Sequence, residues 1–136
     1  MDKDKYKNNP AYPESDLTEK IIGWAYKVYR ELGYGLPEKT YQRAFAECLK
    51  ENKLKYSKEK YGKIVFNNIT IGKYYLDFLI GDKVAVEFKV RGDIYETDTI
   101  QLLNYIKSED IPIGLVVVFT KKGLKIKRLA NTKIQR

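Results

Sequence analysis

Two neighbouring stretches decide the fold: Tyr74-Tyr75-Leu76-Asp77-Phe78-Leu79-Ile80 and, after Gly81-Asp82-Lys83, Val84-Ala85-Val86-Glu87-Phe88-Lys89-Val90. In both stretches the even-numbered residues are apolar or aromatic. Successive side chains of a strand point to opposite faces of a sheet. The alternation therefore predicts two strands, over residues 73–80 and 83–90, each with one apolar face.

The register between these two strands follows from their apolar faces. In an antiparallel hairpin, a slip of one residue would turn one apolar face into water. Both faces meet one core if Phe78 lies opposite Val86, which predicts a loop of three or five residues around Gly81 rather than a two-residue loop. The same register places Asp77 opposite Glu87, with Lys89 beside them.

Two carboxylates placed opposite each other on a sheet repel, so something must offset the repulsion. Lys89, a proton or a bound cation would each do so. The alternative is that these are ordinary solvent-facing charges, with Lys89 bridging the two acids. The sequence alone leaves this choice open.

The flanking segments predict an α/β fold, in which a mixed sheet carries packed helices. Upstream, helical spacing predicts one helix from an N-cap at Asp16 to Gly33 and a second from Pro37 to about Asn52. The other expected elements are a weak strand over 55–60, a strand over 63–68, a helix over 96–108, a strand buried on both faces over 113–120 and a last strand over 124–129.

Composition limits the chemistry that the chain can perform. Its 136 residues suit one domain, which we expect over residues 16–136, after a flexible polar arm over residues 1–15. The chain has no histidine, which excludes Ser–His and Cys–His nucleophile pairs and histidine-bound zinc. Cys48 is the single cysteine, which excludes an intrachain disulfide. Carboxylates, lysines, tyrosines and oxygen-bound metals remain.

The charge balance indicates an anionic partner. Lysine and arginine number 26 against 18 acids, a formal net charge of +8 that suits nucleic acid. Of the two nucleic acids, we expect DNA rather than RNA. No apolar run approaches the roughly 20 residues of a membrane span, and the first residues lack a signal-peptide core. These features predict a cytoplasmic protein that does not cross a membrane.

Three motifs carry a resemblance to a known family. Asp77 followed by Glu87-Phe88-Lys89 resembles the PD-(D/E)XK nuclease superfamily, whose signature is an acid on one strand and acid-x-Lys on the next. Gly35-Leu36-Pro37-Glu38-Lys39-Thr40-Tyr41 reads G-x-x-E-x-x-Y and resembles the small prokaryotic GxxExxY proteins. Gln101-Leu102-Leu103-Asn104-Tyr105 is similar to the Q-x-x-x-Y helix motif of the RecB-like branch.

This resemblance covers residues 16–129 and implies a restriction-endonuclease-like αβββαβ core with an extra N-terminal helix. Two positions depart from the family pattern. Tyr29 stands where the family often has a histidine, and Gly33-Tyr34-Gly35 stands where it has Gly-Pro-Gly.

The resemblance implies a nuclease that hydrolyses phosphodiester bonds of DNA or RNA with Mg²⁺ or Mn²⁺. Asp77, Glu87 and the Phe88 carbonyl would bind the cation, and Glu38 would join them directly or through water. Lys89 would orient the attacking water or stabilise charge on the phosphoryl oxygens.

Further residues are candidates for contacts with water or substrate. Gln101 would contact the attacking water, Lys89 or a phosphate, while Tyr105 and Tyr41 would bind the substrate. Simpler alternatives stay open: Glu38 as the partner of a helix dipole, Gln101 and Tyr105 as a polar surface pair, and Tyr41 as a packing residue. Asp98 is an additional candidate acid behind the site.

Two other functions fit the same sequence. In the first, the chain is a non-catalytic nucleic-acid-binding or assembly module. In the second, it is an enzyme that acts on a different phosphate ester. The small size leaves little room for a separate DNA-reading domain, so specificity would come from a partner or a homodimer.

Overall fold

The computed structural model of the chain describes residues 14–132. Its elements in chain order are α1 (Ser15–Leu32), α2 (Glu38–Glu51), β1 (Tyr56–Phe66), β2 (Ile69–Ile80), β3 (Val84–Val90), α3 (Glu96–Ser108), β4 (Ile113–Thr120) and β5 (Gly123–Ala130). The strands form one mixed sheet in the order β1-β2-β3-β4-β5, antiparallel except for the β3–β4 pair. From α2 to β4 this is the αβββαβ core of a restriction-endonuclease-like fold, with α1 before it and β5 after it.

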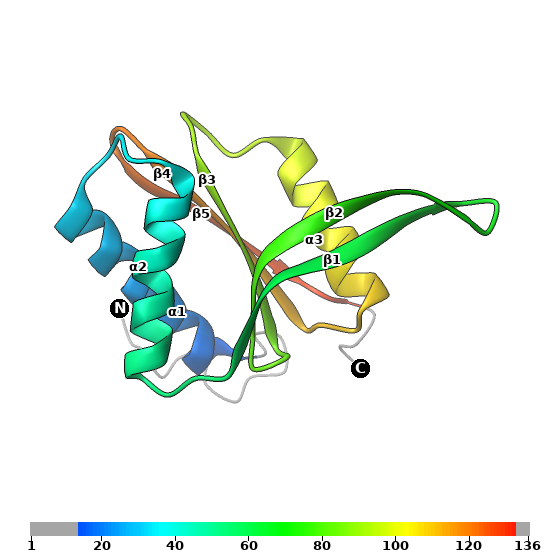
Figure 1. Cartoon of the computed structure of the whole chain (residues 1–136), viewed down its shortest axis with the longest axis horizontal. Helices are drawn as coiled ribbons and strands as arrows, with labels where there is room; N and C mark the ends of the chain where they lie inside the picture. Colours follow the sequence, from blue (N-terminus) through cyan, green and yellow to red (C-terminus); the bar gives the residue numbers. More distant parts are fainter. Residues whose placement is uncertain (1–13, 133–136) are drawn as a thin grey trace.

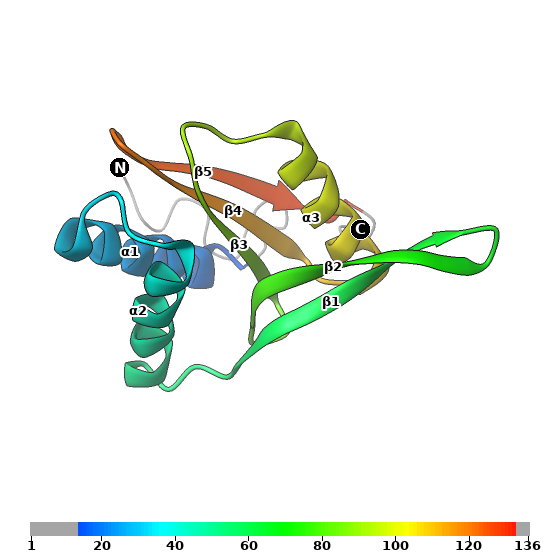
Figure 2. The same cartoon turned by 45° about the horizontal axis from the view of Figure 1, so that its top comes forward.

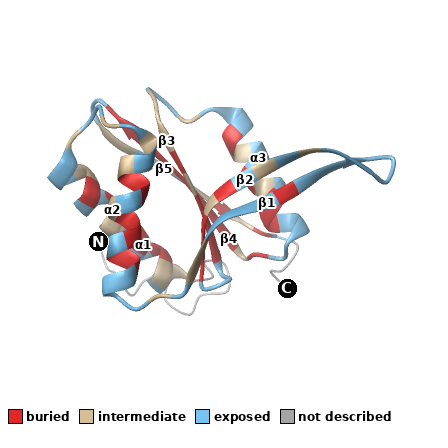
Figure 3. Ribbon diagram, viewed as in Figure 1, coloured by how far each residue is buried: buried red, intermediate tan, exposed pale blue. Residues whose placement is uncertain are grey.

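The sheet separates two layers of helices (Figures 1 and 2). On the α1–α2 side, the rings of Phe45, Phe78 and Phe88 pack with centroids 5.0 to 5.7 Å apart. On the α3 side, Leu102 and Ile106 belong to a second core cluster that includes residues of β3 and β4. Strand β4 is therefore buried on both faces, as its apolar run predicts (Figure 3).

Several predicted boundaries are confirmed and two are wrong. Helix α3 and strand β4 have the predicted bounds. Helix α1 starts at Ser15 after Glu14, so the predicted N-cap at Asp16 lies inside the first turn instead. The two strands expected over 55–60 and 63–68 are one strand, β1. Residues 1–13 of the N-terminal segment predicted to be flexible lie outside the described residues.

A tight turn ends β1 and joins it to β2. Asn67 and Asn68 both have positive φ angles, of 51° and 63°, and lie between the two strands. Paired left-handed residues match the twist of a hairpin, and asparagine tolerates that conformation better than most residues. Asn67 and Asn68, expected at the end of a strand over 63–68, are therefore the turn of one long β1–β2 hairpin.

The predicted register of β2 and β3 is confirmed. Phe78 pairs with Val86 and Ile80 with Val84, which leaves a three-residue loop over 81–83. The apolar face of β2, however, does not continue as predicted. Tyr74 and Leu76 pack in the α3 cluster, whereas Phe78 and Ile80 pack in the α1–α2 cluster.

A bend at Asp77 causes this change of face. The pairing of β2 with β3 ends at Phe78 and Val86, and Asp77 has no partner in the register between β1 and β2. Glu59, the residue of β1 that would pair with Asp77, has a positive φ of 58°. The prediction that residues 74–80 share one apolar face is therefore wrong, because β2 leaves β3 at Asp77 and turns toward α3.

Beyond the bend, β1 and β2 continue as a two-stranded extension that we call the arm, residues 60–75. The arm crosses α3 and projects past it (Figures 1 and 2). Tyr74 holds the arm on α3, with its ring edge-on to Tyr105 at 5.9 Å. At the end of the arm, residues 63–71 are all exposed (Figure 3). Gly72, which follows them, is half-buried.

Candidate active site

Asp77 and Glu87 lie where the hydrogen-bond ladder between β2 and β3 opens. The Phe88 N–H donates to Asp77 Oδ2 over 2.7 Å, and the Asp77 N–H donates to Glu87 Oε1 over 3.0 Å. In a continued antiparallel ladder, Leu76 would lie opposite Phe88 and accept its N–H. The Asp77 side chain replaces that carbonyl, so each acid is held by the backbone at the opening.

Burial and neighbouring carboxylates raise the pKa of both Asp77 and Glu87. Burial is the largest cause that raises the pKa of Asp77 to about 6, and the nearby Glu38 carboxylate adds to it. Burial also raises the pKa of Glu87 to about 8, and the Asp77 carboxylate is the next cause. The Lys89 ammonium and the hydrogen bonds from backbone N–H groups act in the opposite direction on both. A cation between the carboxylates would take the place of the proton.

Helix α2 brings two further charges to the pair. Glu38 is the first residue of α2, directly after Pro37, and is half-buried. Its carboxylate raises the pKa of both Asp77 and Glu87, while the Lys39 ammonium lowers that of Asp77. Lys39 also pairs with Glu59 of β1 over 3.8 Å. The start of α2 therefore lies within electrostatic reach of the two acids.

The donor atoms fit a hard divalent cation. Within residues 14–132, no hydrogen bond or ion pair engages Asp77 Oδ1 or Glu87 Oε2. The Phe88 carbonyl faces the same opening as its N–H, because both groups of a strand residue point to one edge. Carboxylate and carbonyl oxygens are the ligands that Mg²⁺ and Mn²⁺ prefer. Among the described residues, no group of three or more Asp, Glu, His or Cys side chains is placed to hold a metal ion.

Comparison with known proteins identifies the family of the chain. The model of the PD-(D/E)XK nuclease superfamily matches residues 15–129. The chain belongs to this superfamily. Asp77 at the bend of β2 and Glu87-Phe88-Lys89 along β3 are the residues whose pattern resembles the superfamily signature.

No curated protein matches the chain. Among solved structures, the crystal structure of SSO0001 matches with a TM-score of 0.54 and 18% identity. The alignment covers 89% of this chain and 61% of the other, so this chain spans under two thirds of that structure's length. At this identity the likeness shows the fold alone.

The third member of the PD-(D/E)XK signature, Lys89, lies on β3 two residues after Glu87 and is half-buried. It lowers the pKa of both acids, so its ammonium is close enough to act on them, although it forms no ion pair with either. Gln101 is exposed on α3 and makes no hydrogen bond with residues 14–132. Hydrogen bonds hold Asp77 and Glu87 close together. The charges of Lys89 and Glu38 act on both acids without a direct contact, and no contact links Gln101 to them.

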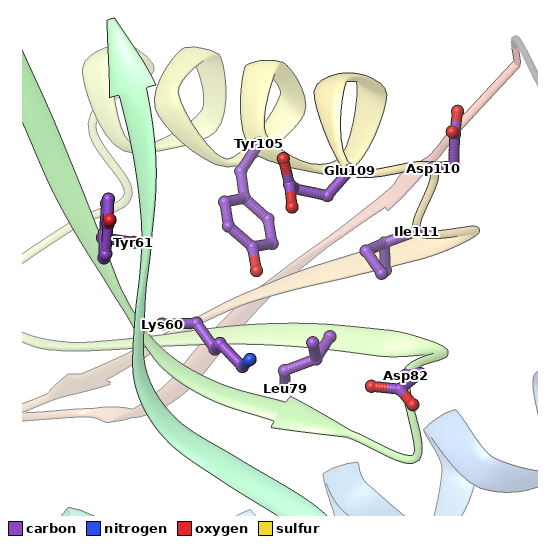
Figure 4. Close-up of a pocket in the computed structure, with 8 residues that line it drawn as sticks. All are labelled: Lys60, Tyr61, Leu79, Asp82, Tyr105, Glu109, Asp110 and Ile111. Atoms are coloured by element: carbon purple, nitrogen blue, oxygen red, sulfur yellow. The ribbon is translucent and has the colours of Figure 1, made fainter.

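The two predicted substrate-binding tyrosines lie elsewhere. Tyr41 is fully buried, stacks on Phe119 with centroids 4.2 Å apart, donates its hydroxyl to the Gly33 carbonyl and accepts the Leu36 N–H. Tyr105 is buried too, and its hydroxyl points into a hollow of about 480 Å³ that Lys60 and Glu109 help to line (Figure 4). Tyr41 thus fixes the turn before α2 and offers no surface to a substrate.

The remaining candidates have structural partners. Asp98 is buried and pairs with Arg91 over 2.7 Å, which ties the start of α3 to the end of β3. Tyr29, at the position where the family often has histidine, donates its hydroxyl to the Thr120 carbonyl over 2.6 Å.

Among residues 14–132, no helix is long and apolar enough to cross a bilayer.

The sequence analysis missed two residues near the acids. Lys39 follows Glu38 in the G-x-x-E-x-x-Y motif, so its position in the sequence could have indicated a positive charge near the acids. The Glu87 carboxylate raises the pKa of Tyr74, after the larger effects of burial, Tyr105 and Glu109. Nothing in the alternation of β2 indicates this effect.

Proposed function

We propose that the chain is a metal-dependent nuclease that hydrolyses phosphodiester bonds in DNA or RNA, with residues 16–136 as its single domain. The observation that carries the proposal is the pair of backbone hydrogen bonds that hold Asp77 and Glu87 at the opening between β2 and β3. Each carboxylate keeps one oxygen for a cation. Membership of the PD-(D/E)XK nuclease superfamily supports the same conclusion.

In this proposal Asp77, Glu87 and the Phe88 carbonyl hold Mg²⁺ or Mn²⁺, and Glu38 joins directly or through a water. A bound cation supplies charge stabilisation at the phosphate and lowers the pKa of water. Lys89 orients the attacking water or donates to a phosphoryl oxygen, where a fixed donor acts on charge that develops in the transition state.

Gln101 and Tyr105 take lesser parts in the proposal. Gln101, exposed on α3, contacts the attacking water, Lys89 or a phosphate. Tyr105 contacts a phosphate from the neighbouring hollow. We assign Tyr41 to the turn before α2 because its hydroxyl is already bonded. The preference for DNA, the cytoplasmic location and the homodimer stay predictions.

A non-catalytic nucleic-acid-binding module is the second candidate. The observation in its favour is that only two acids approach closely, since no third one joins them within residues 14–132. Such a module would keep the fold and the charge of the family while it cuts nothing.

Cleavage assays separate the two candidates. Labelled single- and double-stranded DNA and RNA are incubated with the wild-type chain in Mg²⁺, Mn²⁺ or EDTA, beside Glu87→Gln and Lys89→Ala. We expect products only with metal. Lys89→Ala should lose at least about 100-fold, as for removal of one transition-state donor, and Glu87→Gln should also lose cutting, because it removes a proposed ligand of the cation. Asp82→Asn, which removes an exposed acid from the β2–β3 loop, should cut normally. Nucleic-acid binding without cutting under any of these metals would favour the module.

A further inference from the structure

The arm has two chemically different faces. On the inner face, the Tyr74 ring covers Gly62 and packs on Tyr105 of α3. On the outer face, Tyr61 pairs across the strands with Tyr75, and Lys63 pairs with Lys73. Figure 4 shows Tyr61 on the side of β1 away from Tyr105. The two outer tyrosines are 45% and 62% exposed, so this face is open to a partner.

The outer face carries positive charge with nothing to balance it. Lys63 and Lys73 lie directly opposite each other, and like charges in that position destabilise a sheet. The arm contains no Asp or Glu, and neither lysine forms an ion pair with residues 14–132. An anion between the two ammonium groups would relieve this repulsion.

Aromatic rings flank the same two lysines. Lys73 Nζ lies 4.7 Å from the centre of the Tyr61 ring. The Tyr61 and Tyr75 rings have centroids 5.9 Å apart. Grooves that combine lysines with exposed aromatic rings hold nucleic-acid strands, since the cations bind phosphates and the rings stack on bases.

The outer face also leads to the candidate active site. Lys73 and Tyr75 share the outer face of β2, and Asp77 follows two residues later, at the bend where β2 changes face. A strand of nucleic acid that lies along Lys73 and Tyr75 therefore runs toward Asp77, at the bend where the arm leaves the body of the protein.

We propose that the outer face of the arm (Tyr61, Lys63, Lys73 and Tyr75) binds the nucleic acid whose phosphodiester bond reaches Asp77 and Glu87. This inference rests on the proposed function. Lys63 and Lys73 bind backbone phosphates, and Tyr61 and Tyr75 stack on exposed bases or pack on sugars. A two-stranded ribbon also fits the major groove of a duplex, so the shared chemistry is a phosphodiester backbone, single- or double-stranded.

Charge favours nucleic acid over a second copy of the chain as the occupant of this face. Two arms packed on each other would bring four lysines together with no acid from either arm to pair with them. The exposed apolar side chains near the tip, such as Phe66 and Ile69, suit contacts with bases, because apolar wedges commonly insert between base steps.

The test measures nucleic-acid binding by fluorescence anisotropy in a Glu87→Gln background, which prevents cutting. Fluorescein-labelled single-stranded DNA, duplex DNA and RNA of 30 nucleotides are the probes, in Mg²⁺ and over a range of salt. We expect Lys63→Gln with Lys73→Gln to weaken binding at least about tenfold and to lower the salt slope by about 2. The preferred probe shows whether the occupant is single- or double-stranded.

A matched control removes the same charge from the other end of the molecule. Lys20→Gln with Lys27→Gln changes two exposed lysines of α1, which lies far from the arm (Figure 1). This control should weaken binding by less than about threefold, since general charge alone acts weakly. Tyr61→Ala with Tyr75→Ala should weaken binding at constant net charge, and circular dichroism checks that each variant is folded. Equal losses in the arm and the control pair, or no loss in either, would overturn the proposal.

Failure of this inference is distinguishable from failure of the proposed function. If the wild-type chain cuts and the arm variants bind and cut normally, the nuclease stands and the arm proposal falls. If the wild-type chain cuts nothing but binding still depends on Lys63 and Lys73, the arm proposal stands alone. A dimer that Phe66→Ser with Ile69→Ser converts to monomer, with binding unchanged in the lysine variants, would assign the arm to a second copy and overturn the proposal.

Discussion

Asp77 donates its backbone N–H to the Glu87 carboxylate over 3.0 Å, at the residue where β2 leaves β3. In turn, the Phe88 N–H donates a hydrogen bond to the Asp77 carboxylate over 2.7 Å. Two half-buried acids are thus held by backbone N–H groups. This arrangement has consequences for stability, packing and metal binding that can be measured.

Stability without metal should fall as pH rises from 5 to 8. Burial raises the pKa of Asp77 to about 6 and that of Glu87 to about 8, whereas the unfolded chain releases these protons at about pH 4. The folded state therefore holds protons that the unfolded state has lost, so the free energy of unfolding decreases through this window. Urea unfolding in EDTA should show a decrease of about 1–4 kcal/mol.

Two variants identify the groups responsible. Glu87→Gln should remove most of this pH dependence, because the amide does not titrate. Asp93→Asn should leave it unchanged, since Asp93 is exposed and the Ile94 N–H lowers its pKa. A decrease of the same size in Glu87→Gln would show that other groups cause it.

Tyr41→Phe tests whether this residue is structural. The variant loses the bonds to the Gly33 carbonyl and the Leu36 N–H, which should cost about 1–2 kcal/mol in the free energy of unfolding. The KM and kcat of cleavage should stay within about twofold, because the hydroxyl faces the turn. Tyr26→Phe, at an exposed position of α1, should change neither quantity. A raised KM with unchanged stability would restore Tyr41 as a substrate-binding residue.

Gly62→Ala tests how the arm is held on α3. A Cβ at Gly62 would lie 2.7 Å from the Tyr74 ring, and that ring packs edge-on against Tyr105. The ring must move, so we expect a loss of about 1–3 kcal/mol in urea unfolding and a change in the near-ultraviolet circular dichroism of the tyrosines. Gly92→Ala, where a Cβ meets nothing within 4 Å, is the control. Equal stability of Gly62→Ala and wild type would show that Tyr74 does not fix the arm.

The sequence predicts the centre of the fold and the core of the site for simple physical reasons. Only one register buries both Phe78 and Val86, and that register brings Asp77 to Glu87. Helix α3 and strand β4 are separated by Pro112, and each has a single pattern of apolar residues, so their bounds are predictable.

The arm and the bend are not predictable from the same patterns. The alternation of β2 continues unchanged through Asp77, because residues 74, 76, 78 and 80 are all apolar or aromatic. In the structure, however, residues 74 and 76 pack with α3, whereas residues 78 and 80 pack with α1 and α2. The turn at Asn67-Asn68, in contrast, is a local signal that the sequence does contain. Tyr41 has the same chemistry on a surface or in a core, and only the position of the Gly33 carbonyl decides between them.

The most direct test of the central claim is Mn²⁺ binding by isothermal titration calorimetry at pH 7.5. We predict binding by the wild-type chain and normal binding by Asp82→Asn. Asp77→Asn and Glu87→Gln should each lose at least about tenfold in affinity, because loss of even a group that only supports a ligand typically costs 10–100-fold. Lys89→Ala should keep its affinity for Mn²⁺, because it loses a positive charge and no ligand. If Asp77→Asn and Glu87→Gln bind Mn²⁺ as tightly as the wild-type chain, these two residues do not hold the cation and the account is wrong.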